Sequence, residues 1–198
     1  HEGWRNRLAA RVSSRHLLLL LVPLLLAAKK PPPPPPEPAP TVTLGVEKWR
    51  VGDYAAAVTI WTPFAQSGDP AALYNLGQAY KLGRGVPQDL ARARDYYAAA
   101  AAKGSLPGQA TYGIMLFQAG NKPEALRWLK LAADRGEPRA QYVLGVATFN
   151  GDGTRRSRPL GYGYLLRAAS SGLATAKTML TAIEPSLSPA DRSGGMAV

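Results

Sequence analysis

The stretch ALYNLGQAYKLGRGVPQD, residues 72–89, decides the fold because its pattern recurs along the chain. Each repeating unit ends at a glycine outside the quoted stretch. These glycines are Gly68, Gly104, Gly136 and Gly172, separated by 36, 32 and 36 residues. Eight positions before each of the last three glycines stands an aromatic residue, at Tyr96, Trp128 and Tyr164. Repeats of this length are typical of helical arrays, in which each unit buries its apolar face against the next. We therefore predict an all-α solenoid of antiparallel helix pairs.

The first helix of each unit carries the pattern AxYxLG, at 72–77 and 140–145, and ATYGIM at 110–115 is assigned to the same positions. Small residues at Ala72, Gly77 and Gly145 are expected where two helices approach closely. The tyrosines of the pattern are expected in the core, covered by the neighbouring repeat, and they are Tyr74, Tyr112 and Tyr142.

The loop glycines of the opening stretch have a structural explanation. Gly83 and Gly85 stand where a helix ends and the chain needs positive φ, which costs glycine little. A phosphate-binding loop would follow a buried strand and would place Lys and then Ser or Thr after its last glycine. Neither this loop nor GYGY at 161–164 does so, which argues against a nucleotide site of that type.

The sequence LYNLGQAYKLGRGVPQDLARARDYYAAAAAKG, residues 73–104, with WRVGDYAAAVTIWTPFAQSGDPA before it, resembles the SEL-one-like repeat family, a branch of the tetratricopeptide-type helical repeats. The resemblance covers about residues 44–182. It implies a right-handed superhelix of about four to five helix pairs that binds other proteins or peptides. It does not indicate which partner is bound.

The N-terminal segment predicts export. Four arginines between residues 5 and 15 precede the apolar run LLLLLVPLLLAA at 17–28, the order typical of a signal peptide. Its length fits a signal-peptide core better than a spanning helix, which needs roughly 20 residues, yet the residues around Ala28 make a poor cleavage site. Residues 1–30 are therefore predicted to be a signal peptide or a retained membrane anchor. The expected location is the periplasm, free or anchored to the inner membrane.

Three segments follow the export signal. Residues 31–41 are rich in proline and are predicted to form a stiff, extended linker. Residues 42–183 are assigned to the repeat solenoid. Residues 184–198 contain few apolar residues and several helix breakers, so a flexible tail is expected there.

The repeat region is basic, which favours a partner with acidic character. After residue 40 the chain has 18 Lys and Arg against 11 Asp and Glu. The densest cluster lies in GTRRSRPLG at 153–161 and comprises Arg155, Arg156 and Arg158. We predict an anion-binding loop that grips phosphate, an anionic lipid surface or an acidic peptide. A solvated loop without a ligand is the alternative.

A second candidate surface consists of first-helix residues that the packing pattern leaves free. They stand three, six and nine positions after the alanine of the pattern, or at the middle position in the short repeat, and are Asn75, Gln78, Lys81, Leu116, Val143, Val146 and Phe149. By analogy with the tetratricopeptide-type fold, we expect them to line a partner-binding groove on the concave side. Packing in the core is the alternative.

Catalysis is not predicted. The histidines, His1 and His16, precede the repeats, and the sequence has no cysteine, so His- or Cys-based nucleophilic chemistry and thiol metal sites are excluded there. Four carboxylates stand at predicted helix starts, where capping explains them, namely Asp53, Asp69, Asp89 and Glu124. We expect no cofactor, no metal and no nucleic-acid partner. The predicted function is a protein-interaction scaffold or adaptor of the cell envelope, with binding of an anionic envelope polymer or lipid as the alternative.

Overall fold

The computed structural model describes residues 39–198, and the unit described below is Pro40–Val198. The predicted signal or anchor segment, residues 1–30, and residues 31–38 of the predicted linker lie outside the described residues. Among residues 39–198, no helix has both the length and the apolar character needed to cross a membrane.

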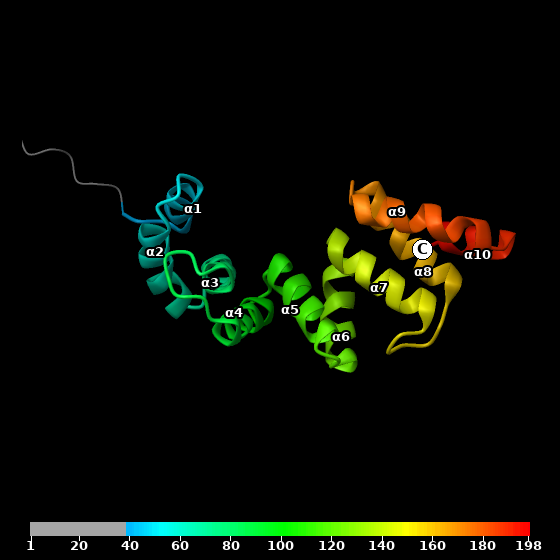
Figure 1. Ribbon diagram of the computed structural model, residues 1–198, viewed down its shortest axis with the longest axis horizontal. Helices are drawn as coiled ribbons and strands as arrows, with labels where there is room; N and C mark the ends of the chain where they lie inside the picture. Colours follow the sequence, from blue (N-terminus) through cyan, green and yellow to red (C-terminus); the bar gives the residue numbers. More distant parts are fainter. Residues whose placement is uncertain (1–38) are drawn as a thin grey trace, which may run out of the picture. The chain divides into compact units, whose positions relative to one another are not determined.

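The described part of the chain is a succession of helices without a strand, and Figure 1 shows them following one another in chain order. Their bounds are α1 (Val42–Arg50), α2 (Tyr54–Gln66), α3 (Pro70–Leu82), α4 (Leu90–Ala102), α5 (Leu106–Gln118), α6 (Lys122–Asp134), α7 (Pro138–Asn150), α8 (Arg158–Ser170), α9 (Ala174–Ile183), the 3-10 helix η2 (Glu184–Ser186) and α10 (Pro189–Met196).

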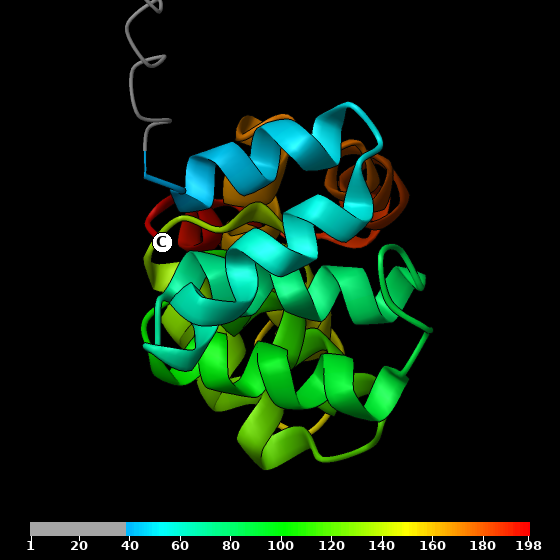
Figure 2. The same cartoon turned by 90° about the vertical axis from the view of Figure 1, so that its left-hand side faces the viewer.

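Consecutive helices pack against each other as antiparallel pairs. The pairs are α1–α2, α3–α4, α5–α6 and α7–α8, and each pair contacts the next through α2–α3, α4–α5 and α6–α7. Figure 2, seen from the α1 end, shows the first pairs stacked on one another. The predicted all-α solenoid is confirmed, with four pairs followed by α9 and α10.

The first helices of the pairs lie on the inner side of the array. α3 contacts α5 and α5 contacts α7, whereas the second helices α4, α6 and α8 make at most marginal contacts with one another. Helices on the inside of a curve approach each other and those on the outside diverge. The inner face is therefore formed by the first helices.

Each pair crosses where a glycine of the first helix faces a large side chain of the second. A Cβ atom on Gly77 would lie 2.7 Å from Cε1 of Tyr97, a side chain that is 0% exposed and has no room to move. Only glycine lets the two backbones come this close. The four pairs of facing residues are Gly45–Trp61, Gly77–Tyr97, Gly113–Leu129 and Gly145–Leu165.

The structure corrects the register predicted for the middle repeat. The sequence comparison placed Ala110 opposite Ala72, and therefore Met115 opposite Gly77. The crossing glycine is the eighth residue of the 13-residue helices α3, α5 and α7, so Gly113 is the true counterpart of Gly77. The helix crossing requires a glycine at this position, whereas the alanine of the pattern can shift. Each crossing glycine lies nine residues after the glycine that ends the preceding unit, Gly68, Gly104 or Gly136. Using this constant distance would have given the correct register.

The repeat residues predicted from the sequence lie at the core and the turns. Ala72 and Gly145 are buried, and Tyr164 is buried as well. The other aromatic residues of the pattern are half-buried at the edge of the core, and they are Tyr74, Tyr112, Trp128 and Tyr142. The predicted turn and junction glycines all have positive φ, and they are Gly68, Gly83, Gly85, Gly104, Gly136 and Gly172.

The predicted helix starts are also present. The carboxylates of Asp53, Asp69 and Asp89 accept hydrogen bonds from backbone N–H groups two or three residues further on. Glu124 lies in the first turn of α6, where its carboxylate accepts a hydrogen bond from the amide of Asn121 at 2.8 Å. These acidic side chains are accounted for by capping and by the helix dipole.

The C-terminal segment is helical, so the prediction of a flexible tail at 184–198 was wrong. Helix α10 folds back on α8. A Cβ atom on Gly163 of α8 would lie 2.6 Å from Cβ of Val198 and 2.7 Å from the carbonyl oxygen of Gly195. A capping box between Ser188 and Asp191 begins the helix. The prediction failed because close backbone contact at glycines holds α10, and a count of apolar side chains does not register this.

The crossing at Gly77 can be tested with a double-mutant cycle. We expect Gly77→Ala to destabilise the protein with Tyr97 present and to cost less with Tyr97→Leu, since leucine faces the glycine in the next two pairs. The expected coupling in the free energy of unfolding is about 0.5–3 kcal/mol. Any gain in helix propensity from alanine is equal in both backgrounds and cancels. Denaturant unfolding of the four proteins measures it, and a coupling of zero would contradict the assigned contact.

Candidate functional site

The inner face carries a groove between the first helices of the first three pairs. Its volume is about 570 Å³. Val46 of α1 is 38% exposed here, so the groove presents free apolar surface. The lining residues come from α1, α3 and α5 or directly precede α5, and they are Val42, Thr43, Val46, Pro70, Ala71, Tyr74, Asn75, Ser105, Leu106 and Pro107.

Two of the three polar residues predicted for the partner-binding surface lie at this groove or contact its lining. Asn75 lines it. The side-chain amide of Gln78 donates a hydrogen bond to the hydroxyl of Tyr74 at 2.6 Å, and so helps to fix a second lining residue. Lys81 is exposed in the last turn of α3 and is not part of the lining.

The apolar residues predicted for the same surface lie in or against the core. Val143 packs on the cluster around Leu129 and Leu144, and Val146 and Phe149 pack on the cluster around Leu165. Leu116 is only 9% exposed, and the corrected register of α5 separates it from the position of Gln78. The structure therefore does not bring these four side chains together with Asn75.

The residues that the sequence reasoning missed sit at the start of successive first helices. Val42 and Val46 belong to α1, and Leu106 and Pro107 to the first turn of α5. The prediction followed positions along one helix at a time, whereas the groove forms between helices. The recurring proline in the first turn of α3 and α5 is the sequence signal that marks this edge.

The three arginines of the predicted anion-binding loop do not share one environment. Arg155 and Arg156 are exposed in the loop before α8. Arg158 is the first residue of α8 and is not a loop residue. Its guanidinium lies 5.1 Å from the centre of the Phe149 ring, so it packs on that ring while the side chain stays partly exposed.

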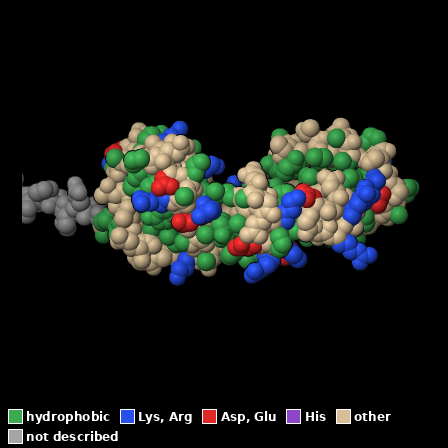
Figure 3. All heavy atoms as spheres, turned by 60° about the horizontal axis from the view of Figure 1, so that its bottom comes forward, with side chains coloured by type: hydrophobic (Ala, Val, Ile, Leu, Met, Phe, Trp, Pro, Cys, Tyr) green, Lys and Arg blue, Asp and Glu red, His purple; other side chains and the backbone are tan. Residues whose placement is uncertain are grey.

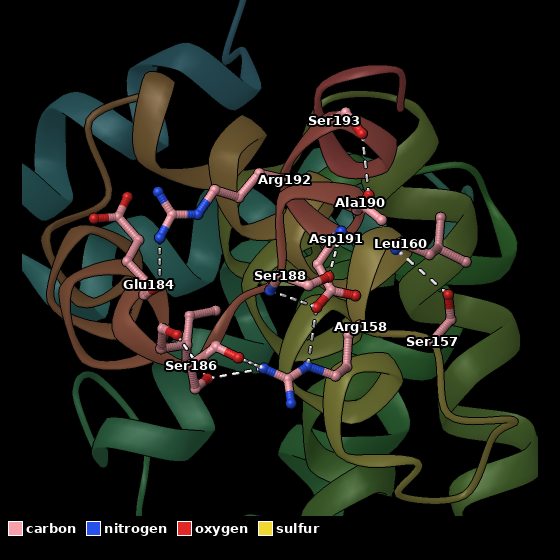
Figure 4. A network of polar contacts seen from close by, with 11 residues as sticks. Ser157, Arg158, Leu160, Glu184, Ser186, Ser188, Ala190, Asp191, Arg192 and Ser193 are labelled. Carbon is pink, nitrogen blue, oxygen red and sulfur yellow. Dashed lines mark hydrogen bonds and ion pairs between the residues drawn. The ribbon is translucent and has the colours of Figure 1, made fainter.

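Arg158 joins the start of α8 to the C-terminal segment, as Figure 4 shows. Its Nη2 donates hydrogen bonds to the carbonyl oxygen and to the hydroxyl of Ser186, the latter at 2.9 Å. Its Nε lies 3.6 Å from a carboxylate oxygen of Asp191, an ion pair slightly longer than a hydrogen bond. Arg158 thus stabilises the position of α10, and its charge is already balanced by a carboxylate.

The carboxylate of Asp191 is the acidic partner in this network. It accepts a hydrogen bond from the backbone N–H of Ser188 at 3.0 Å. This bond, the interaction with the Ser188 side chain and the charge of Arg158 hold the pKa of Asp191 below its ordinary value of 3.8. The ionised form is therefore the form that the folded C-terminal segment favours.

The surface charge is spread along the molecule. On the face that Figure 3 presents, Lys and Arg side chains are interleaved with Asp and Glu and do not gather in one patch. Several basic side chains are paired, such as Lys130 with Asp134 at 2.8 Å and Arg139 with Glu137 at 2.7 Å. On this face the positive charge therefore acts on a partner as a distributed field.

No group of three or more His, Cys, Asp or Glu side chains that could hold a metal ion occurs among residues 39–198. Burial raises the pKa of Tyr97 far above its ordinary value of 10.0. Its hydroxyl is buried without a hydrogen-bond partner in the described structure. This tyrosine stays neutral and packs in the core.

The family model of the Sel1 repeat matches residues 70–105, 111–137 and 138–173. These ranges correspond to the helix pairs α3–α4, α5–α6 and α7–α8. The similar solved structures include two repeat proteins. A Sel1 repeat protein from Oxalobacter formigenes is 27% identical with a TM-score of 0.68, covering 80% of this chain and 62% of that one. The protective antigen c5321 of uropathogenic Escherichia coli, with an SLR fold, is 26% identical with a TM-score of 0.68, covering 77% and 35%.

The curated relatives that match part of the chain include the following two proteins. The uncharacterized protein NMB1327 of Neisseria meningitidis serogroup B is 28% identical over 54% of this chain and 23% of its own length. The DAP3-binding cell death enhancer 1 of Mus musculus is 35% identical over 58% of this chain and 30% of its own length. The chain therefore spans less than a third of either of these relatives.

Acidification is expected to release α10 before the solenoid unfolds. Because the pKa of Asp191 is lowered in the folded state, its stabilising contribution is complete above about pH 3.8 and is lost as the pH falls through the lower folded value. Two-dimensional NMR should show the amide signals of Gly194 and Gly195 moving toward unfolded positions in this range. Asp191→Asn should produce the same change at neutral pH. Native signals for α10 in that variant would contradict the role of the carboxylate.

Proposed function

Because the chain belongs to the Sel1 repeat family, we propose that it is a non-catalytic scaffold that binds a partner protein or peptide in the inner-face groove between α1, α3 and α5. Proteins with this repeat are generally protein–protein interaction scaffolds. One of the similar proteins is named for binding another protein, DAP3, which fits the same class of function.

The observation that carries the proposal is the groove itself. Its volume of about 570 Å³ lies within the range of roughly 300–1,000 Å³ typical of ligand sites. Its walls are mostly apolar, with Asn75 and Ser105 among the few polar residues. Such a lining suits the apolar side chains of a peptide segment, with hydrogen bonds at a few fixed points.

The partner is proposed to have acidic character. The described unit has an excess of Lys and Arg over Asp and Glu, and this charge is distributed along its surface. A distributed positive field attracts an acidic partner and speeds its association, while the groove supplies the short-range contacts. We therefore expect salt to weaken binding mainly through the association rate.

The site of action is proposed to be the cell envelope, supported by the basic segment and apolar run of residues 5–28. A fusion of residues 1–41 to alkaline phosphatase tests this, because that reporter needs the disulfides that form outside the cytoplasm. We expect an active fusion, and loss of activity when Leu19→Arg and Leu20→Arg interrupt the apolar run. An inactive wild-type fusion, or equal activity of both, would contradict export. Fractionation then separates a retained anchor from a cleaved signal.

The groove is tested by a matched pair of substitutions. Ala71 lines the groove at the second residue of α3, and Ala91 is exposed at the second residue of α4. Ala71→Glu places a charge where a partner must pack, so we expect at least about a tenfold loss of affinity, or 1.4 kcal/mol. Ala91→Glu adds the same charge to the outer side and should leave affinity unchanged.

The measurement is a cross-linking pull-down from the cell envelope with the full chain, followed by affinity measurement on the recovered protein. Both variants should keep the wild-type melting temperature, because an acidic residue in the first turn suits the helix dipole. A protein that both variants retain equally would remove the groove from the proposal. Recovery of an anionic polymer alone, in salt-sensitive form, would overturn the scaffold function in favour of polymer binding.

A further inference from the structure

A second, smaller cavity of about 260 Å³ lies between α6, α7, α8 and the loop before α8. It is separate from the inner-face groove, with which it shares no lining residue. Two basic side chains reach it, Lys130 from α6 and Arg155 from the loop. Its remaining lining is split between hydroxyl groups, from Thr148, Thr154, Ser157 and Tyr164, and two leucines, Leu144 and Leu160.

The first full repeat fills the corresponding space with packed side chains. Helices α3 and α4 match α7 and α8 with an offset of 68 residues, so Thr148 corresponds to Tyr80 and Tyr164 to Tyr96. In the earlier repeat these two tyrosine rings stack at 5.5 Å, and Arg92 donates a hydrogen bond to the Tyr80 hydroxyl at 3.0 Å. Threonine at position 148, in place of Tyr80, removes the stack. Leucine at position 160, in place of Arg92, removes the hydrogen bond. The cavity is thus a specific departure from the repeat pattern.

Two of the hydroxyl groups in the cavity have no protein partner. Thr148 is 4% exposed and Tyr164 is 7% exposed, so both side chains are more than nine-tenths buried. Neither hydroxyl makes a hydrogen bond to another residue within 39–198, and neither oxygen is among the fully buried atoms, so both are open to the cavity that the two residues line. A ligand that accepts hydrogen bonds can therefore replace water at these two hydroxyls.

The charges around the cavity leave one basic side chain uncompensated. Lys130 is held by Asp134, with Nζ–O distances of 2.8 and 3.1 Å. Arg155 forms no ion pair with any residue in the described part of the chain. The cavity therefore offers a net charge close to +1 together with several hydroxyl donors.

We propose that this cavity is a receptor for a single carboxylate, the side chain of a glutamate or aspartate on a bound peptide. The guanidinium of Arg155 pairs with a carboxylate through two parallel hydrogen bonds, and the hydroxyls of Thr148 and Tyr164 supply further donors. Leu144 and Leu160 contact the methylene groups of a glutamate. A single negative charge matches the one free basic residue, whereas a doubly charged phosphate would be undercompensated and repelled by Asp134.

The test uses two probes that differ only in the side chain, the α-amides of N-acetylglutamate and N-acetylglutamine, titrated into the full chain. Two-dimensional NMR should show saturable shifts at Thr148, Arg155 and Tyr164 with the glutamate probe and none with the glutamine probe. Arg155→Gln should weaken binding at least about tenfold, because a charge-assisted bidentate contact is lost. Arg156→Gln removes the same charge from the same loop outside the cavity and should change affinity by less than about twofold.

A third variant, Thr148→Tyr, restores the residue that fills the equivalent space at Tyr80 and should abolish the shifts while the melting temperature is retained. If that variant does not fold, the Arg155 and Arg156 comparison still decides. Equal weakening by both arginine variants, equal shifts with both probes, or no shift at the cavity would overturn the proposal. Binding of inorganic phosphate without binding of the glutamate probe would overturn the carboxylate assignment. These outcomes do not depend on the effect of Ala71→Glu, so the groove proposal and the cavity proposal can be contradicted separately.

Discussion

In each of the four pairs, the two helices cross at one point, where a glycine of the first helix meets a large buried side chain of the second. The helix backbones approach so closely there that a single methyl group on Gly77 would collide with the ring of Tyr97. This contact fixes the crossing within a pair, and the exposed edges of each pair are then covered by the next one. The inner groove exists because successive first helices are held at a constant position by these crossings.

At the end of the array, glycines of α8 make the same kind of close contact with two neighbouring segments. In GYGY at 161–164, Gly161 meets the backbone of Phe149 in α7, while Gly163 meets Gly195 and Val198. One turn of α8 therefore contacts its pair on one side and the returning C-terminal helix on the other. Arg158 and Asp191 add an ion pair at the start of that contact. A solenoid needs a terminal cap to cover its last apolar surface, and here α9 and α10 supply it.

The fold could be predicted from the sequence because the recurring positions tolerate few residue types. Junction glycines need positive φ and recur every 32 to 36 residues, so they revealed the helix pairs. The alanine pattern was less constrained, and relying on it displaced the middle repeat by two residues around Gly113. The surface was harder to predict, because it depends on which helices become neighbours. Arg155, Arg156 and Arg158 are close in sequence, yet one lines a cavity, one is simply exposed and one holds the C-terminal helix.

Regular packing also explains where binding sites can arise in such a chain. The crossing glycines and their partners cannot vary without moving the helices, so differences between repeats collect at positions that face a neighbour less tightly. Position 80 and its counterpart 148 illustrate this, because tyrosine closes the space in one repeat and threonine opens it in the other. The backbone around both positions remains the same 13-residue helix. A cavity created in this way inherits rigid walls from the repeat, and its chemistry is set by the few side chains that the repeat leaves free.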